Sequence, residues 1–418
     1  MSSIENQYAI IVGIAKKSSE LPEVERSLDE LTRLLDTAGG IVHARVVQVK
    51  ETYEPRTLIG SGKVSEIAQI VENSDVQLIV FDEELTPAQI RNLENDIGDV
   101  TVIDRSMLIL DIFALHAVSG EGKLQVELAQ LKYTAPRLTG KGIALSRQGG
   151  GIGSRGPGES KLETDRRHLH EKIVNLEMRL RELEHNRNTM RAQRDRSGLT
   201  KIGLVGYTNA GKSTLLNYLT DAGVLSMDKL FATLDPTTRK LELPSGETVL
   251  VTDTVGFIRK LPHHLVRAFK STLDEVRCAD MLIIVLDASD EELEEHFAVT
   301  KNVINELGAG DKPFIVAYNK CDLISNSSIN YAAENSCYIS AASGFGIEKL
   351  LSLIEKTIHS AKTEVDILIP YTQQGILNSI YNEYSVLSTE YADNGVLARV
   401  ILDSKGLGQY SKYLLNKG

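Results

Sequence analysis

The chain is poor in cysteine and has no hydrophobic run long enough to cross a membrane. Its three cysteines, Cys278, Cys321 and Cys337, are odd in number, and no two have CxxC spacing, which argues against a disulfide framework and against a zinc site. The longest apolar runs, residues 8–14 and 281–286, have the length of strands and fall far short of the ~20 residues that a membrane span requires. The composition therefore favours a globular protein without a membrane span.

No leader for export is expected from the N-terminal residues. The N-terminal stretch Met-Ser-Ser-Ile-Glu-Asn-Gln has neither a basic n-region nor an apolar h-region, and a secretory signal needs both. We therefore expect a cytoplasmic location, with loose peripheral association with a membrane left open. The length of 418 residues is too great for one ordinary core and predicts about two to four domains.

Basic residues are outnumbered overall and concentrated in one segment. The chain carries 46 Lys and Arg against 57 Asp and Glu, a formal net charge of -11, which by itself argues against a nucleic-acid partner. Residues 132–196, however, hold fifteen Lys and Arg against eight Asp and Glu, or +7, which leaves -18 for the remainder. This basic segment of an acidic chain is where we expect an anionic partner such as RNA to bind.

A complete phosphate-binding loop lies in the middle of the chain. After the short apolar run 202–205, residues 206–213 match the GxxxxGK[ST] pattern in full. A glycine-rich turn that opens a helix presents unpaired backbone N–H groups to phosphate oxygens. Lys212 adds a positive charge for the β- and γ-phosphates, and the Ser213 hydroxyl is a hard oxygen ligand for Mg²⁺. The predicted phosphate-binding residues are Gly206, Tyr207, Thr208, Asn209, Ala210, Gly211, Lys212, Ser213 and Thr214.

A second motif predicts how the third phosphate is sensed. The strand-like residues 248–251 lead into Asp253, Thr254, Val255 and Gly256. An acid at the end of a strand that faces the phosphate loop can hold Mg²⁺ through water, and a glycine N–H can contact the γ-phosphate. We therefore place this motif in the nucleotide site.

Two later motifs predict that the base is guanine. The Asp322 carboxylate can accept two hydrogen bonds from the ring N–H and exocyclic amine of guanine, a donor pair that adenine lacks. The four motifs occur in order, each at the end of a strand pattern, and this order favours a GTP-binding and GTP-hydrolysing domain. The predicted base-binding residues are Asn319, Lys320, Asp322, Ser340, Ala341 and Ala342.

A first switch is predicted at residues 231–235, where one hydroxyl must close onto Mg²⁺ when GTP is bound. Thr233 is our choice because the Phe-x-Thr-Leu pattern resembles the switch of related GTPases, while Thr237 and Thr238 remain alternatives. The switch residues that we assign to nucleotide binding are Phe231, Ala232, Thr233, Leu234 and Asp235. The predicted Mg²⁺ ligands are Ser213, Thr233 and Asp253, and the residues expected to act in catalysis are Lys212, Thr233 and Gly256.

The catalytic site lacks the usual water-positioning side chain. Many GTPases carry a Gln directly after DxxG, but this chain has Phe257, followed by Ile258. Neither side chain can polarise water, so we expect slow intrinsic hydrolysis. A partner, a rearranged backbone or a cation must then complete the catalytic site. The amide oxygen of Asn209 could coordinate K⁺ in that role.

The order of strand and helix patterns predicts an α/β class with four domains. We expect a small N-terminal α/β domain at 1–120 and an antiparallel two-helix stalk with a glycine-rich loop at 121–197. A P-loop GTPase domain with a doubly wound sheet follows at 198–361, and a small C-terminal α+β domain, with an Asn-Gly hairpin turn, at 362–418. The turn at residues 60–63 could be a second phosphate loop, but it lacks the full spacing, and we favour a plain turn.

The predicted stalk joins a heptad seam to a basic glycine-rich loop. The loop carries no acid from residue 133 to residue 158, and it is either a solubilising linker or a tip whose arginines contact RNA phosphates, which we favour. A narrow heptad seam favours one partner helix, and the nearest candidate is the helix pattern at 123–133. The seam residues are Leu162, Leu169, Ile173, Leu176, Leu180 and Leu183, and the basic loop residues are Arg137, Lys141, Arg147 and Arg155.

These motifs together resemble the HflX-type GTPases of the Obg-HflX branch. The resemblance rests on the phosphate loop, on residues 231–239, on 253–258 and above all on the run at 151–167, Gly-Ile-Gly-Ser-Arg-Gly-Pro-Gly-Glu-Ser-Lys-Leu-Glu-Thr-Asp-Arg-Arg. It covers roughly residues 1 to 361. It implies a ribosome-associated GTPase that uses Mg²⁺ and GTP and binds the large (50S) ribosomal subunit and its ribosomal RNA near the peptidyl-transferase centre.

The same resemblance implies that the GTP-bound protein splits or rescues stalled or idle 70S ribosomes and that the ribosome stimulates hydrolysis. We expect a monomer. The main alternative is an RNA-binding GTPase that acts in ribosome assembly or dormancy without splitting. A signalling GTPase with a protein effector and no RNA is a third interpretation.

Overall fold

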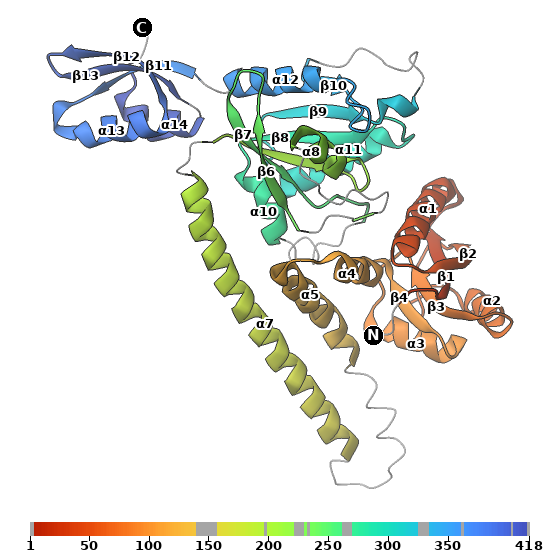
Figure 1. The fold of residues 1–418 in the computed structure, drawn as a ribbon. Coiled ribbons are helices and arrows are strands. Elements are labelled where there is room, and N and C mark those ends of the chain that lie inside the picture. The colour runs from red at the N-terminus through yellow and green to blue at the C-terminus, as the bar shows by residue number, and fades with distance from the viewer. Residues whose placement is uncertain are drawn as a thin grey trace. The chain divides into compact units, whose positions relative to one another are not determined.

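The computed structural model divides the chain into two compact units (Figure 1). The N-terminal unit comprises Met1–Glu184, Met227–Asp235 and Ile258–Thr272, and the C-terminal unit comprises the remaining residues. The predicted first switch at 231–235 and the segment that follows the Asp253–Gly256 motif therefore belong to the N-terminal unit. The structure describes residues 4–138, 157–195, 199–220, 230–231, 235–260, 270–324, 334–360, 363–402 and 404–415.

A four-stranded parallel sheet forms the centre of the N-terminal unit. The strands are β1 (Tyr8–Ala15), β2 (Ile41–Val49), β3 (Val76–Phe81) and β4 (Thr101–Asp104), in the order β2-β1-β3-β4. They alternate with α1 (Leu21–Thr37), α2 (Ser61–Glu72), α3 (Pro87–Ile97) and α4 (Arg105–His116), as parallel strands require. The predicted α/β class is confirmed for this part of the chain.

Local sequence explains where these helices begin. Thr86 caps α3 through a capping box with Gln89, and Pro87 occupies the first helical position, where its missing N–H costs nothing. The Asp104 side chain accepts the Met107 N–H at 3.0 Å and caps α4. The hydrophobic residues of α4 surround the helix without the periodicity of a one-sided face, so the sequence pattern did not predict this helix.

The glycine turn before α2 begins a helix. The Gly60 N–H donates to Gln48 Oε1 at 2.9 Å, and Lys63 Nζ pairs with Glu66 Oε2 at 2.6 Å. A lysine that is paired with an acid of its own helix turn is not directed at a phosphate. These contacts support the plain-turn interpretation of residues 60–63.

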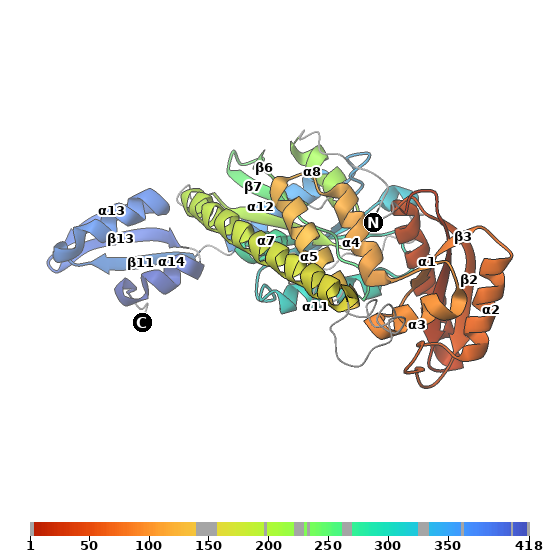
Figure 2. The same cartoon turned by 90° about the horizontal axis from the view of Figure 1, so that it is seen from below.

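Two long helices follow in the chain, and ion pairs join them. They are α5 (Gly120–Leu138) and α7 (Pro157–Asp195), which lie side by side in Figure 2. Lys132 Nζ lies 2.8 Å from Glu177 Oε1, and Lys172 Nζ lies 2.7 Å from Glu127 Oε1. Leu176 of the predicted seam is buried. The basic glycine-rich loop at 139–156 lies outside the described residues.

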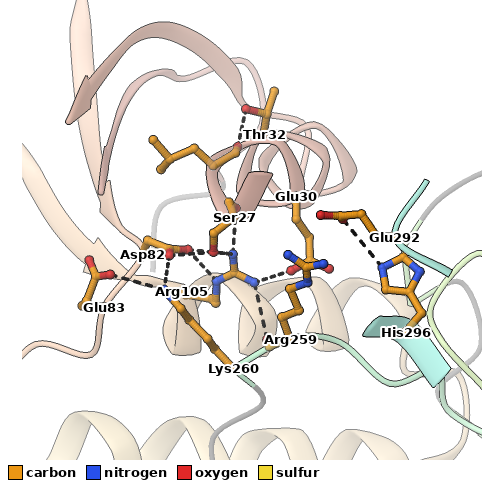
Figure 3. Close-up of polar contacts among 11 residues, drawn as sticks. Ser27, Glu30, Thr32, Asp82, Glu83, Arg105, Arg259, Lys260, Glu292 and His296 are labelled. Atoms are coloured by element: carbon orange, nitrogen blue, oxygen red, sulfur yellow. Dashed lines mark hydrogen bonds and ion pairs between the residues drawn. The ribbon is translucent and has the colours of Figure 1, made fainter. Parts of the chain in front are cut away.

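A buried arginine ties α1, β3 and α4 together (Figure 3). Arg105 is 2% exposed, and its guanidinium contacts Glu30 at 2.7 Å and Asp82 at 2.6 Å. It also donates to the Ser27 carbonyl at 2.9 Å, and the Ser27 hydroxyl donates to Asp82 at 2.7 Å. Burying a guanidinium requires that its charge and its donors be matched, and this group of side chains supplies both.

Residues 259 and 260, which follow the Asp253–Gly256 motif, contact the same group of side chains. Lys260 Nζ pairs with Asp82 and lies 3.3 Å from Glu83 Oε1, and the Arg259 carbonyl accepts from Arg105 at 3.5 Å. Lys260 has a positive φ of 50°, a conformation that residues with a side chain seldom adopt. The ion pairs compensate for this backbone cost.

The C-terminal unit contains a six-stranded sheet in the order β10-β9-β8-β5-β7-β6. The strands are β5 (Lys201–Gly206), β6 (Thr237–Glu242), β7 (Thr248–Asp253), β8 (Met281–Asp287), β9 (Phe314–Asn319) and β10 (Ser336–Tyr338). Only β6, at one edge, is antiparallel to its neighbour. Side chains of α8 (Lys212–Thr220) and α12 (Ile347–Ser360) share one hydrophobic core with alternate residues of the sheet.

The helix α11 (Leu293–Glu306) packs on β8 and β5, and α10 (Lys270–Cys278) precedes β8. The sheet is therefore mixed, with one antiparallel edge strand, as a P-loop GTPase domain requires. This confirms the α/β class at the coarse level.

A three-stranded antiparallel sheet ends the chain. It contains β11 (Thr363–Ile369), β12 (Ser385–Ala392) and β13 (Gly395–Leu402) in the order β11-β13-β12, with α13 (Gln374–Glu383) and α14 (Ser404–Gln409). The β12–β13 turn needs its glycine, since a Cβ on Gly395 would lie 2.3 Å from the Ile369 carbonyl oxygen. Among the described helices, none is long and apolar enough to cross a membrane, and all three cysteines are free.

The Glu83 carboxyl is expected to make the stability of the N-terminal unit depend on pH. Burial raises the pKa of Glu83 from its ordinary 4.5 to about 7, against the opposing effect of Lys260. Because this pKa is higher in the folded state, the folded protein holds the proton more tightly. The resulting stabilisation is complete below pH 4.5 and is lost as the pH rises through 7.

We expect wild type to lose about 2 to 3 kcal/mol more unfolding free energy than Glu83→Gln between pH 5 and pH 8. Urea unfolding of both proteins at the two pH values measures this difference. Glu66→Gln, at an exposed site, is the control and should follow wild type. Equal losses in wild type and Glu83→Gln would contradict the assignment.

Candidate nucleotide site

The phosphate loop connects β5 to α8, and glycine is required at two of its positions. A Cβ on Gly206 would lie 2.2 Å from the Val285 carbonyl oxygen, and a Cβ on Gly211 would lie 2.2 Å from Asn319 Nδ2. Gly211 also has a φ of +91°, which favours glycine. The two glycines therefore let the loop pass directly against β8 and against the first residue of the base-binding motif.

The Lys212 side chain is buried within this loop. It is 6% exposed, and its Nζ donates to the carbonyl oxygens of Tyr207 at 2.8 Å and Gly206 at 3.3 Å. Burial lowers the pKa of Lys212 to about 8, although the nearby Asp253 carboxylate acts in the opposite direction. The loop thus positions one ammonium group where the β- and γ-phosphates are expected to bind.

Asp253 and Gly256 lie beside the phosphate loop. The Ser213 hydroxyl donates to Asp253 Oδ2 at 2.6 Å, and Asp253 is fully buried at the end of β7. A Cβ on Gly256 would lie 2.7 Å from Thr208 Cα and 3.0 Å from Lys212 Nζ. The structure therefore brings the predicted hydroxyl and carboxylate ligands of Mg²⁺ into direct contact, with the predicted γ-phosphate sensor next to the lysine.

Phe257 is joined to the phosphate loop through its backbone only. Its N–H donates to the Gly206 carbonyl at 3.0 Å, and its carbonyl accepts the Thr208 N–H at 2.8 Å. The Phe257 ring is 1% exposed, so this residue presents neither a polar group nor an exposed side chain to an attacking water. The lack of a water-positioning side chain, read from the sequence, therefore agrees with this geometry.

Asn319 connects the phosphate loop to the base-binding loops. Its Nδ2 donates to the Ala210 carbonyl at 2.8 Å, and its Oδ1 accepts the Ala341 N–H at 2.9 Å. The Ser340 hydroxyl accepts the Ser343 N–H at 3.2 Å and is fully buried. Asp322 is exposed, as a carboxylate that receives a base must be.

Lys320 forms an ion pair with an acid that is not among the predicted site residues. Lys320 has a φ of +61°, and its Nζ pairs with Asp287 Oδ2 at 2.7 Å. Asp287 is the last residue of β8, and an acid at the end of a buried strand is a pattern that could have revealed it. This pair fixes Lys320, so that its aliphatic stem can cover one face of a bound base.

Only part of the predicted first switch can be placed. Ala232, Thr233 and Leu234 lie outside the described residues, so the choice of Thr233 as a Mg²⁺ ligand stays a prediction. Phe231, with a φ of +56°, packs its ring against Phe113 at 4.7 Å between centroids in the N-terminal unit. Of the two alternatives, Thr237 pairs with Asp253 in the β6–β7 register, and the Thr238 hydroxyl contacts Thr252 at 2.9 Å.

The Asp235 carboxylate contacts the protein backbone at the beginning of α5. It accepts the N–H groups of Ser119 at 2.7 Å and Val118 at 3.1 Å, and it also accepts the Ser119 hydroxyl. The Ser119 hydroxyl accepts the Gly122 N–H at 2.8 Å. The structure thus gives the Asp235 side chain a capping role in the N-terminal unit, and its predicted part in nucleotide binding stays a prediction.

The affinity for GTP is expected to fall as the pH rises through the pKa of Lys212. Only the charged amine attracts phosphate, so deprotonation of the free protein weakens binding. With a pKa of about 8, the charged fraction falls about fourfold between pH 6.5 and pH 8.5, and the affinity should fall by a similar factor. Titration of the protein with a fluorescent GTP analogue at each pH measures this affinity. An affinity that does not change with pH would refute the lowered pKa of Lys212.

Three family models match consecutive parts of the chain. The model described as GTP-binding GTPase N-terminal matches residues 25–114, the one described as GTP-binding GTPase Middle Region matches 116–194, and the one described as 50S ribosome-binding GTPase matches 201–320. Together they cover more than half of the chain.

Curated relatives match nearly the whole length. The chain is 45% identical to the GTPase HflX of Lacrimispora saccharolytica over 94% of both chains. It is 42% identical to the GTPase HflX of Escherichia coli strain K12 over 88% of this chain and 87% of that one. A solved GTP-binding protein from Sulfolobus solfataricus in complex with GDP covers 84% of this chain and 98% of its own, but at 24% identity and a TM-score of 0.44 it adds nothing to the assignment. By its motifs, its family models and these relatives, the chain belongs to the HflX family of GTPases and is a GTP-hydrolysing enzyme.

Proposed function

We propose that this GTPase binds the large (50S) ribosomal subunit and splits or rescues stalled or idle 70S ribosomes. The observation that carries the proposal is the union, in one HflX-family chain, of a complete GTP site with a basic helical segment in an otherwise acidic protein. The model that matches residues 201–320 is described as a 50S ribosome-binding GTPase. Ribosomal RNA would bind the basic segment through its phosphates.

The parts of the chain take separate roles in this proposal. The α/β domain at 1–120 and the helical hairpin at 121–197 would contact the ribosome, with the loop at 139–156 as the RNA-binding tip. The domain at 198–361 would bind and hydrolyse GTP, and residues 362–418 would form a separate C-terminal domain. The protein would act as a cytoplasmic monomer, with loose peripheral membrane association as a secondary expectation.

The residues of the phosphate site fit a magnesium ion. A hydroxyl and a carboxylate, Ser213 and Asp253, lie 2.6 Å apart, and Mg²⁺ prefers such hard oxygen ligands. When bound, Mg²⁺ would neutralise developing charge on the phosphate oxygens. Ser213 would ligate it directly, Asp253 through water, and Thr233 would be the ligand from the first switch.

The chain's own groups would orient GTP without completing catalysis. Lys212 would hold the β- and γ-phosphates, the Gly256 N–H would contact the γ-phosphate, and Asp322 would select guanine. Because Phe257 contributes no polar group, the water-positioning element would come from the ribosome or from a cation. Slow hydrolysis in the free protein and faster hydrolysis on the ribosome follow from this division.

Splitting is tested by sedimentation of purified 70S particles. We expect 70S particles to separate into subunits with wild type and a non-hydrolysable GTP analogue, and to stay intact with GDP. Replacing residues 139–156 by a Gly-Ser linker of equal length should reduce splitting at least tenfold and leave GTP affinity unchanged, because it removes basic phosphate contacts. Stable binding without separation would favour a role in assembly or dormancy, and splitting by the linker variant would favour a protein effector.

A potassium ion at Asn209 is a further part of the proposal. Asn209 is half-buried in the phosphate loop with a φ of +59°, and its amide oxygen would share K⁺ with the phosphates in place of an arginine finger. Hydrolysis by the free protein should be several-fold faster in KCl than in NaCl, and Asn209→Ala should abolish the difference. Equal rates of the wild-type protein in the two salts would remove K⁺ from the mechanism.

A further inference from the structure

A buried histidine lies against the phosphate loop. His296, in the first turn of α11, is 6% exposed. Its ring stacks on the ring of Tyr207, with the centroids 3.7 Å apart and the planes inclined by 15°. Tyr207 directly follows the first glycine of the phosphate loop, so α11 contacts this loop through one pair of aromatic rings.

Two carboxylates flank the histidine ring. Asp290 Oδ2 lies 3.6 Å from Nδ1, and Glu292 Oε2 lies 3.9 Å from Nε2, the latter drawn in Figure 3. The acids approach different ring nitrogens, whereas a metal ion needs its ligands directed at one point. Both distances are longer than a hydrogen bond, so the stack on Tyr207 is the close contact of the ring.

The Asp290 side chain is itself fixed at the start of α11. Its Oδ1 accepts the Glu292 N–H at 3.0 Å, and the Glu292 carbonyl accepts the His296 N–H at 2.9 Å. One turn later the Thr300 hydroxyl donates to the His296 carbonyl at 2.8 Å. The histidine therefore sits on a well-connected helix end, which gives the stacked ring a rigid support.

The main chain at Tyr207 supports two parts of the catalytic site. Its carbonyl accepts Lys212 Nζ at 2.8 Å. The residues on either side, Gly206 and Thr208, exchange backbone hydrogen bonds with Phe257 at 3.0 Å and 2.8 Å. A tilt of Tyr207 would thus move both the lysine that faces the phosphates and the segment that follows Gly256.

We propose that His296 is a positioning residue for GTP hydrolysis, which acts by holding Tyr207 through ring stacking and thereby fixes the Lys212 amine. The ring stacks on Tyr207, so its effect would pass through the backbone of Tyr207 to Lys212. Charge grows on the phosphate oxygens in the transition state, so a misplaced lysine costs turnover more than ground-state binding. This inference concerns hydrolysis by the free protein and does not depend on the proposed ribosomal function.

The test compares His296→Ala, His296→Leu and His296→Phe with wild type in steady-state GTP hydrolysis without ribosomes. Loss of one buried aromatic stack should lower kcat about three- to tenfold in the Ala and Leu variants, with KM changed less than twofold. His296→Phe keeps a flat ring and should restore most of kcat. His296→Leu fills the space without a ring, and it keeps the test decisive if the Ala variant does not fold.

Val303→Ala is the matched control because Val303 is a buried residue later in the same helix. It should lower the unfolding temperature while leaving kcat within twofold of wild type. A kcat for His296→Leu within twofold of wild type would overturn the proposal. So would an equal loss of kcat in Val303→Ala, or a His296→Phe variant as slow as His296→Leu, since either result would show general loosening of the helix.

Discussion

The burial of one ammonium group shapes the nucleotide site. Lys212 can stay charged beneath its own loop only because carbonyl oxygens of Gly206 and Tyr207 accept from it. Gly256 lies so close to this loop that a Cβ on it would be 2.7 Å from Thr208 Cα and 3.0 Å from Lys212 Nζ. The buried lysine therefore ties the phosphate loop to the segment that carries Gly256.

A second buried charge organises the N-terminal unit. Arg105 is matched by Asp82 and Glu30, and Lys260 adds a second cation to Asp82. At Asp82, burial would raise the pKa, but the positive charges of Arg105 and Lys260 outweigh it and the pKa is lowered. At Glu83, burial dominates and raises the pKa. The pKa values of two adjacent carboxyls are thus shifted in opposite directions. Asp82 makes ion pairs with both cations, whereas Glu83 pairs with Lys260 at 3.3 Å.

The site has many contacts that arrange it for binding GTP and few that could position the water for hydrolysis. The contacts of Asn319 unite the phosphate and base halves, and the Ser213–Asp253 pair presents oxygen ligands for a divalent cation. At the position where many GTPases carry a water-orienting Gln, the structure has the buried apolar ring of Phe257. The described residues therefore provide more for holding GTP than for orienting a water.

The sequence by itself determined the nucleotide, the α/β class and the absence of a polar residue at position 257, because each depends on residue types at fixed local spacings. It also located most strands, since buried strands are short apolar runs. Only the tertiary structure decided that Asp235 caps α5, that Asp287 holds Lys320 and that His296 stacks on Tyr207. Those partners are far apart in sequence, and strand order and helix packing bring them together through contacts that no local pattern encodes.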